Sequence, residues 1–271
     1  MTSANSKLIA IDVDGTLVGE DGRPSARTIE TLRRVRSSGH HVVLATGRPF
    51  LVVNRTADAV GEIDYIICSN GAMTVRRSDE AVLRDLWLDD DLPEFAVRAL
   101  RERVPGIGFA LEFERGAKSE PGWKQRLPES VPLGRPVDDV LTLLPERGPV
   151  RKVMVYHDDY DDDLRSLMAI TQEVVGDRAT VTHSGLPFAE VGPVGLHKAV
   201  AIAALCQDLG VDQADVIAFG DDVNDAEMLE WAGTGVAMAN AVPEAVAAAD
   251  VMTAANTDDG VALYLEGVLD G

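Results

Sequence analysis

The chain has 271 residues, of which 46% are hydrophobic and 26% are charged, and its formal net charge is −20. This composition is that of an ordinary globular protein, long enough for one domain or for a core domain that carries an inserted one. The strong negative charge argues against nucleic acid or an anionic membrane as the main partner.

The N-terminal segment lacks a basic patch followed by a long apolar run, so no signal peptide is expected. No stretch approaches the roughly 20 apolar residues that a membrane span needs. Cys68 and Cys206 each lie in an apolar stretch and are expected to be buried, reduced thiols. A cytoplasmic protein is therefore expected.

Short β-branched runs alternate with helical patterns in the first part of the chain, which predicts a parallel sheet with crossover helices. Strands are expected at residues 8–13, 41–45 and 64–68, and helices at 25–38 and 49–60. Ser25 is the expected N-cap of the first helix, and Gly39 is expected to end it.

The middle of the chain has a different rhythm. A hairpin is expected at residues 73–76 and 82–86, followed by a helix at 92–103 and a strand at 107–113. Residues 114–149 are rich in Pro, Gly and charge and receive no assignment. A strand at 150–157, a helix at 161–175 and strands at 180–182 and 188–191 complete this part.

From Gly195 the alternating pattern returns. The expected helices are 197–209, 224–232, 243–249 and 258–269, and the expected strands are 216–219, 235–238 and 251–252. The sequence therefore predicts an α/β fold, a Rossmann-like doubly wound parallel-sheet core formed by residues 1–79 and 191–271. An inserted α+β domain is expected over residues 80–190.

Two carboxylates, Asp12 and Asp14, follow the first predicted strand and precede Gly15. At this spacing they are expected to point the same way, toward the crevice where open α/β sheets bind ligands. Crowded anions need a cation nearby, which favours a metal ion. A solvated, Asp-rich turn is the alternative.

Three later segments add polar groups that suit a phosphate or a metal. Thr46-Gly47-Arg48 presents a hydroxyl and a backbone N–H before a helix, which suits a phosphate oxygen or forms an ordinary turn. Lys198 stands in the first turn of an apolar helix, which indicates an anionic partner or a surface position. Oxygen ligands that suit Mg²⁺, or that cap a helix, cluster after another strand at Asp221, Asp222, Asn224 and Asp225.

In their order along the chain, these segments resemble the haloacid dehalogenase superfamily of phosphohydrolases, and its Cof-type subfamily most. The resemblance is carried by DVDGTL at 12–17, TGR at 46–48, SNGA at 69–72, Lys198, GDDVND at 220–225 and GVAMANA at 235–241. It implies an HAD-like core with an inserted cap domain that sets substrate specificity. P-loop and GxSxG motifs do not occur in the sequence.

The resemblance implies a Mg²⁺-dependent phosphatase that hydrolyses a small phosphate ester, such as a sugar phosphate, through an aspartyl-phosphate intermediate. Asp12 would be the nucleophile, and Asp14 the general acid and base. The residues implied to bind phosphate are Thr46, Gly47, Lys198 and Asn224. The metal would be bound by Asp12, the backbone carbonyl of Asp14 and Asp221. Asp225 would orient Lys198, and Arg48 and Asp222 would also support the site.

Two residues depart from the family pattern. Asp222 stands where Gly or Ser is usual and adds an anion beside the metal, and His197 stands where a small residue is usual. A phosphosugar mutase of the same superfamily is the alternative, followed by a non-catalytic phosphometabolite-binding module. The sequence indicates no oligomeric state, and the candidates for the substrate lining in the insert are Arg115, Lys118, Trp123 and Lys124.

Overall fold

The computed structural model describes residues 6–19, 22–114, 116–123 and 135–270. By its contacts the chain divides into two units, one formed by Met1–Arg84 with His197–Gly271 and the other by Asp85–Leu196. Within the described ranges, no helix combines the length and the apolar character that a membrane crossing requires.

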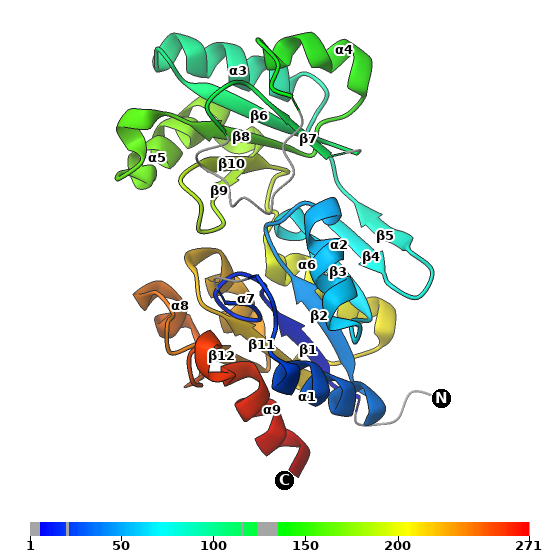
Figure 1. Ribbon diagram of the computed structural model, residues 1–271. Helices are drawn as coiled ribbons and strands as arrows, with labels where there is room; N and C mark the ends of the chain where they lie inside the picture. The colour runs from blue at the N-terminus through cyan, green and yellow to red at the C-terminus, as the bar shows by residue number, and fades with distance from the viewer. Residues whose placement is uncertain (1–5, 20–21, 115, 124–134, 271) are drawn as a thin grey trace. The chain divides into compact units, whose positions relative to one another are not determined.

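The first unit is built on a sheet of eight strands. They are β1 (Leu8–Ile11), β2 (His41–Ala45), β3 (Tyr65–Cys68), β4 (Met73–Arg76), β5 (Ala81–Asp85), β11 (Val216–Gly220), β12 (Thr234–Ala237) and β13 (Val251–Met252). Their order across the sheet is β13-β12-β11-β1-β2-β3-β4-β5 (Figure 1). The pairs from β13 to β3 are parallel, whereas β4 runs antiparallel to β3.

Helices cover both faces of this sheet. One face is packed by α1 (Ala26–Ser37), α2 (Phe50–Val60) and α9 (Gly260–Asp270), and the other by α6 (Lys198–Leu209), α7 (Ala226–Trp231) and α8 (Pro243–Ala248). The alternation of side chains along each strand produces the two faces, because Ile9 and Ile11 face the first group while Leu8 and Ala10 face the second. The predicted doubly wound core is confirmed.

Local signals at the first helix act as predicted. The Ser25 side chain accepts a hydrogen bond from the backbone N–H of Thr28 at 3.0 Å and so caps α1. Beyond its end, Gly39 has a φ of 87°, a conformation that costs glycine little. The helix therefore begins and ends within one residue of the expected bounds.

The order of the strands reverses between β1 and β11. From β1 the chain proceeds to β2 and β3 on one side, and later from β11 to β12 and β13 on the other (Figure 1). Open α/β sheets bind ligands beside such a point, at the carboxyl ends of the strands. Asp12 follows β1 and Asp221 follows β11, so both lie where this rule places a site.

The second unit has a five-stranded antiparallel sheet in the order β7-β6-β8-β10-β9. Its strands are β6 (Gly108–Phe113), β7 (Gly116–Ser119), β8 (Lys152–Tyr156), β9 (Thr180–Thr182) and β10 (Ala189–Gly192), and its helices are α3 (Leu92–Arg103), α4 (Leu144–Arg147) and α5 (Leu164–Val175). Residues from α3 and α5 share one apolar cluster with the sheet. The stretch that received no assignment contains β7 and α4.

Candidate active site

Asp12 is the first residue after β1 and is 4% exposed. Its backbone N–H donates to the carbonyl of Phe219 in β11 at 3.0 Å, which fixes the start of the loop against the neighbouring strand. Gly15 then turns the chain with a φ of 76°, and a Cβ at this position would lie 2.1 Å from Oδ2 of Asp221. Glycine therefore allows the Asp221 carboxylate to approach the loop that begins at Asp12.

Lys198 is the first residue of α6 and is 1% exposed, so it is not a surface lysine. Its Nζ donates to Oδ1 of Asp12 and to Oδ1 of Asp225, both at 2.6 Å. Burial by itself lowers the pKa of this ammonium group, but the two carboxylates more than offset it and raise the pKa above its ordinary value. Lys198 is therefore a charged bridge between Asp12 and Asp225.

Asp225 is fully buried and uses both of its oxygens. Oδ1 accepts from Lys198, while Oδ2 accepts from the backbone N–H groups of Asp221 and Asp222 at 3.0 and 3.1 Å. Asp222 caps the short helical turn Val223–Asp225, because its Oδ1 accepts from the N–H of Val223 at 2.7 Å. The cluster after β11 thus contains a helix cap and also holds Lys198 in place.

Oxygen atoms of Asp12, Asp221 and Asp225 lie within 4.8 Å of one another. Burial raises the pKa of Asp12 well above its ordinary value although Lys198 opposes the shift, and burial raises the pKa of Asp221 to about 7 although the hydrogen bond from Thr16 lowers it. One lysine faces three carboxylates, so negative charge is in excess. The donors are all oxygens, which suits Mg²⁺, and a divalent cation would offset this charge.

Asp14 lies in a different environment from Asp12. The strand ends at Ile11, so the alternation of a strand does not extend to Asp14, which is exposed. Its carboxylate accepts two hydrogen bonds from the guanidinium of Arg48, at 2.7 Å from Nε and 2.5 Å from the terminal nitrogen. The Asp14 side chain is therefore held by Arg48 and does not belong to the acidic group around Asp221.

The segment after β2 contacts two other loops. Thr46 is buried, and its Oγ1 accepts from the backbone N–H of Arg48 at 3.2 Å. The backbone carbonyl of Thr46 accepts from the N–H of Asn70 at 3.0 Å, and the Asn70 side chain accepts from Nδ2 of Asn224 at 3.2 Å. These bonds connect the segments that contain Thr46, Asn70 and Asn224, and Gly47 is buried between Thr46 and Arg48.

Three residues near the acidic group received no individual role from the sequence. Oγ1 of Thr16 donates to Oδ1 of Asp221 at 2.7 Å. Nδ2 of Asn240 donates to the carbonyl of Gly15 at 2.8 Å, and Asn70 has a left-handed φ of 57°. All three lie inside the quoted motifs, so position within a motif was the available signal.

The candidates in the insert have mixed positions. Trp123 is buried against Tyr156 and Phe188, with both ring centroids at 4.9 Å, and Lys118 is half-buried. Arg115 and Lys124 lie outside the described residues. His197 is the N-cap of α6, and its Nδ1 is buried with no hydrogen-bond partner in the described part of the chain.

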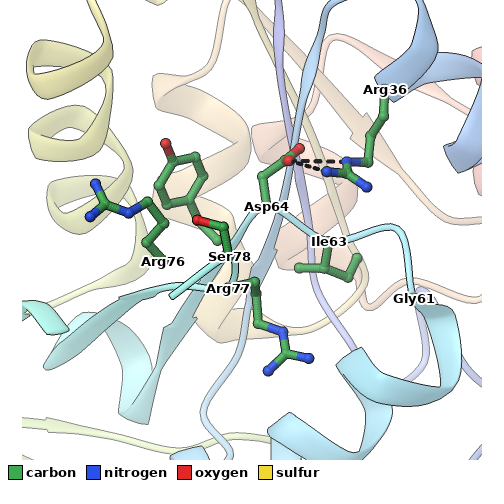
Figure 2. A pocket seen from close by; sticks show the side chains of 8 residues that line it. Arg36, Gly61, Ile63, Asp64, Arg76, Arg77 and Ser78 are labelled. Carbon is green, nitrogen blue, oxygen red and sulfur yellow. Dashed lines mark hydrogen bonds and ion pairs between the residues drawn. The ribbon is translucent and has the colours of Figure 1, made fainter. Parts of the chain in front are cut away.

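A cavity of about 270 Å³ lies beside the amino end of β3 in the first unit (Figure 2). The acidic group, in contrast, follows the carboxyl ends of β1 and β11. Three arginines line it, and each has its own carboxylate: Arg36 contacts Asp64, Arg76 contacts Asp79 and Arg77 contacts Asp58. Figure 2 shows the Arg36 guanidinium directed at Asp64 and the other two pointing in different directions. The three cations therefore do not converge on one ligand position.

Comparisons with known proteins match nearly the whole chain. A family model described as haloacid dehalogenase-like hydrolase matches residues 9–265. YxeH of Bacillus subtilis (strain 168) is 34% identical over 264 residues, which cover 94% of this chain and 96% of that protein. The HMP-PP phosphatase of Klebsiella pneumoniae (strain 342) is 33% identical over 244 residues, covering 88% and 86%. A crystal structure of a haloacid dehalogenase-like hydrolase from Bacteroides thetaiotaomicron matches with a TM-score of 0.83 at 27% identity, over 97% of this chain and 99% of that one.

Proposed function

The chain belongs to the haloacid dehalogenase-like hydrolases, and on this premise we propose that it is a Mg²⁺-dependent phosphatase of small phosphorylated metabolites that uses Asp12 as its nucleophile. Phosphoric monoester hydrolysis itself follows from the family and from its phosphatase relatives. The observation that carries the finer proposal is the Lys198 bridge between Asp12 and Asp225, next to Asp221.

In the first step, a carboxylate oxygen of Asp12 attacks phosphorus. A bond forms between this oxygen and phosphorus, and the bond from phosphorus to the leaving oxygen breaks. An anionic nucleophile and an anionic phosphoryl group repel each other unless positive charge lies nearby. The Lys198 ammonium, 2.6 Å from Asp12, supplies such charge and restrains the nucleophile.

Asp14 moves the protons in both steps. It donates a proton to the leaving oxygen, because an alkoxide leaves poorly, and in the second step it accepts a proton from the water that attacks phosphorus. The bond between Asp12 and phosphorus then breaks and inorganic phosphate is released. In the structure Arg48 holds both oxygens of the Asp14 carboxylate, so one of these two hydrogen bonds must open before Asp14 can carry the proton.

The phosphoryl oxygens would be bound by donors from separate segments. Oγ1 of Thr46 accepts from the N–H of Arg48, so its own O–H proton can be donated to a phosphoryl oxygen. The N–H of Gly47, the amide of Asn224 and the ammonium of Lys198 complete the proposed set. Asn70 supports it by holding the Asn224 side chain at 3.2 Å.

Asp12, the backbone carbonyl of Asp14 and Asp221 would hold Mg²⁺. When bound, this ion would neutralise developing charge on the phosphoryl group. Thr16 holds the Asp221 carboxylate through a 2.7 Å hydrogen bond, and Asp225 holds the backbone of the same loop. We assign the second unit, Asp85–Leu196, to substrate specificity.

A screen of phosphorylated metabolites tests the proposed function. We expect Mg²⁺-dependent release of inorganic phosphate from small phosphate esters, no release in excess chelator, and poor replacement by Zn²⁺ because the donors are all oxygens. A phosphoprotein should react poorly, because a chain with a net charge of −20 repels acidic macromolecules. Full activity in chelator would exclude the metal, and transfer of phosphate within a sugar without release would indicate the mutase.

Thermal unfolding provides a test of the metal that is independent of activity. Folded Asp221 has a pKa of about 7, against an ordinary value of 3.8. The folded state therefore binds more protons between these values, and the free energy of unfolding contributed by this group falls as the pH rises from about 4 to 7. Mg²⁺ offsets that loss, so it should raise the Tm more at pH 8 than at pH 5.5, where protons compete for the site.

At a Mg²⁺ concentration about 100 times the dissociation constant, the gain at pH 8 corresponds to about 2.7 kcal/mol. The Asp221→Asn variant is the matched control, because it removes the titrating ligand and should show a smaller shift at both pH values. A Mg²⁺-induced shift in Tm that is the same at both pH values in the unaltered chain would contradict the assignment of Asp221.

A further inference from the structure

Asn240 follows β12 and bridges the two loops that carry the proposed metal ligands. Its Nδ2 donates to the backbone carbonyl of Gly15 at 2.8 Å, in the loop that begins at Asp12. The same nitrogen lies 3.5 Å from Oδ2 of Asp221, in the loop after β11. We propose that Asn240 is a positioning residue, which sets the affinity of the site for Mg²⁺ by fixing the separation of these two loops. This inference rests on the Mg²⁺-dependent function proposed above.

The turn that carries Asn240 is anchored to the loop after β11 by backbone hydrogen bonds. Before Asn240, the N–H of Met238 donates to the carbonyl of Gly220 at 3.1 Å. After it, the N–H of Val242 donates to the carbonyl of Asp221 at 2.8 Å. The backbone of the turn therefore has a fixed place beside the end of β11, and the Asn240 side chain connects this fixed turn to the loop after β1.

The partners of Asn240 match the two ends of a side-chain amide. The Gly15 carbonyl can only accept a hydrogen bond, whereas the backbone N–H of Asn256, 3.0 Å from Oδ1 of Asn240, can only donate one. A carboxamide offers an acceptor oxygen at one end and two N–H donors at the other. The N–H of Asn256 thus fixes the orientation of the amide and directs Nδ2 toward Gly15 and Asp221.

A donor at this place offsets a repulsion between two acceptors. The Gly15 carbonyl and the Asp221 carboxylate both lie within 3.5 Å of Nδ2 of Asn240, and both oxygens carry negative charge. Gly15 also directly follows Asp14, whose backbone carbonyl is a proposed metal ligand. Without the amide, the two loops are expected to move apart, so the metal ligands would lose their spacing. Partners that orient metal ligands in this way typically change metal affinity by about 10- to 100-fold.

Asn256 supplies a matched control. Its Nδ2 donates to the carbonyl of Val18 at 2.9 Å, so a second side-chain amide holds the loop after β1. Its Oδ1 accepts from the N–H of Thr257 at 3.0 Å, and Asn256 therefore makes the same two kinds of hydrogen bond as Asn240. The nitrogen of Asn240 also approaches Asp221, whereas that of Asn256 binds the far end of the loop. Asn256→Ala keeps its backbone N–H and with it the bond to Asn240.

Isothermal titration calorimetry with MgCl₂ alone on the full chain measures this role without turnover. We expect Asn240→Ala to weaken Mg²⁺ binding about tenfold or more, and Asn256→Ala to weaken it less than about threefold. Thermal unfolding in excess chelator should show both variants folded with similar Tm values, because each loses the same kinds of hydrogen bond. An unchanged Mg²⁺ dissociation constant for Asn240→Ala, or equal weakening in both variants, would overturn the inference and leave the proposed function standing.

The Mg²⁺ dependence of turnover separates positioning from a direct part in the reaction. The Mg²⁺ concentration for half-maximal hydrolysis of a small aryl phosphate should rise in Asn240→Ala by the same factor as the dissociation constant. Saturating Mg²⁺ should then restore its turnover to within a few-fold of the unaltered rate. Turnover that stays low at every Mg²⁺ concentration would contradict a role through the metal. If the unaltered protein bound no Mg²⁺, the proposed function would fail and this inference with it.

Discussion

Replacement of Asp12 by asparagine is expected to lower turnover by at least about 10³-fold while the protein stays folded. An amide of the same size cannot attack phosphorus. It can still accept a hydrogen bond from Lys198, which lies 2.6 Å from Oδ1 in the unaltered protein. Burial disfavours the charged form of Asp12 and so raises its pKa. A neutral amide removes this unfavourable buried charge, and the Tm should therefore not fall by much. Hydrolysis of an aryl phosphate and thermal unfolding measure the two effects.

Asp222→Asn is the matched control for this variant. It removes a carboxylate from the same cluster, but the Asp222 oxygen caps a short helical turn through the N–H of Val223, and an asparagine oxygen can do the same. Its turnover should stay within a few-fold of the unaltered rate. If Asp12→Asn hydrolysed the aryl phosphate at the unaltered rate, the aspartyl-phosphate mechanism would be wrong.

Lys198→Met should reduce stability and turnover together. Removal of the ammonium group leaves Asp12 and Asp225 buried without their shared cation, which costs about 3–5 kcal/mol in comparable buried pairs. Turnover should fall by about 10² or more, because the proposed phosphate-binding charge is lost. Chemical denaturation and steady-state kinetics at saturating Mg²⁺ measure the two losses.

Two further variants separate the structural effect from the catalytic one. Lys7→Met removes a half-buried pair with Asp215 at 3.3 Å, near the surface, and should cost no more than about 1 kcal/mol. Lys198→Met combined with Asp225→Asn removes one unpaired buried charge and should regain part of the stability but none of the turnover. Stability of Lys198→Met equal to that of Lys7→Met would show that the buried bridge contributes little.

Most elements of the core could be predicted because their signals are local. Buried strands such as Leu8–Ile11 and His41–Ala45 are continuous apolar runs, and the Ser25 cap and Gly39 mark the bounds of α1. The alternation of strands and helices then allows few topologies, since parallel strands need crossover helices on the faces of the sheet. The same alternation located the strand ends, and the polar residues that follow those ends were therefore recognised as candidates for the site.

The stretch from 114 to 149 could not be predicted for a physical reason. The strand Gly116–Ser119 has no apolar alternation of its own, and it exists because Ala110–Phe113 of β6 supplies its backbone partners. The strand β5 was expected from the sequence as the second arm of a hairpin, at residues 82–86, but its place in the core sheet, outside the second unit, depends on its pairing with β4. Elements whose stability comes from a partner strand carry a weak signal in their own residues.

The sequence by itself determined the kind of groups at the site and the strand ends that carry them, because residue type and strand periodicity are local properties. Tertiary structure alone decided which of these groups meet. Lys198 is 186 positions from Asp12, and their 2.6 Å contact depends on α6 packing against the sheet beside β1. Tertiary structure likewise gave Asp14 a different partner from that of Asp12, because the chain turns after Ile11 and the guanidinium of Arg48, which follows β2, holds the Asp14 carboxylate. Electrostatic pairing acts over a few ångströms in space, whatever the separation along the chain, and for that reason it could not be read from spacing alone.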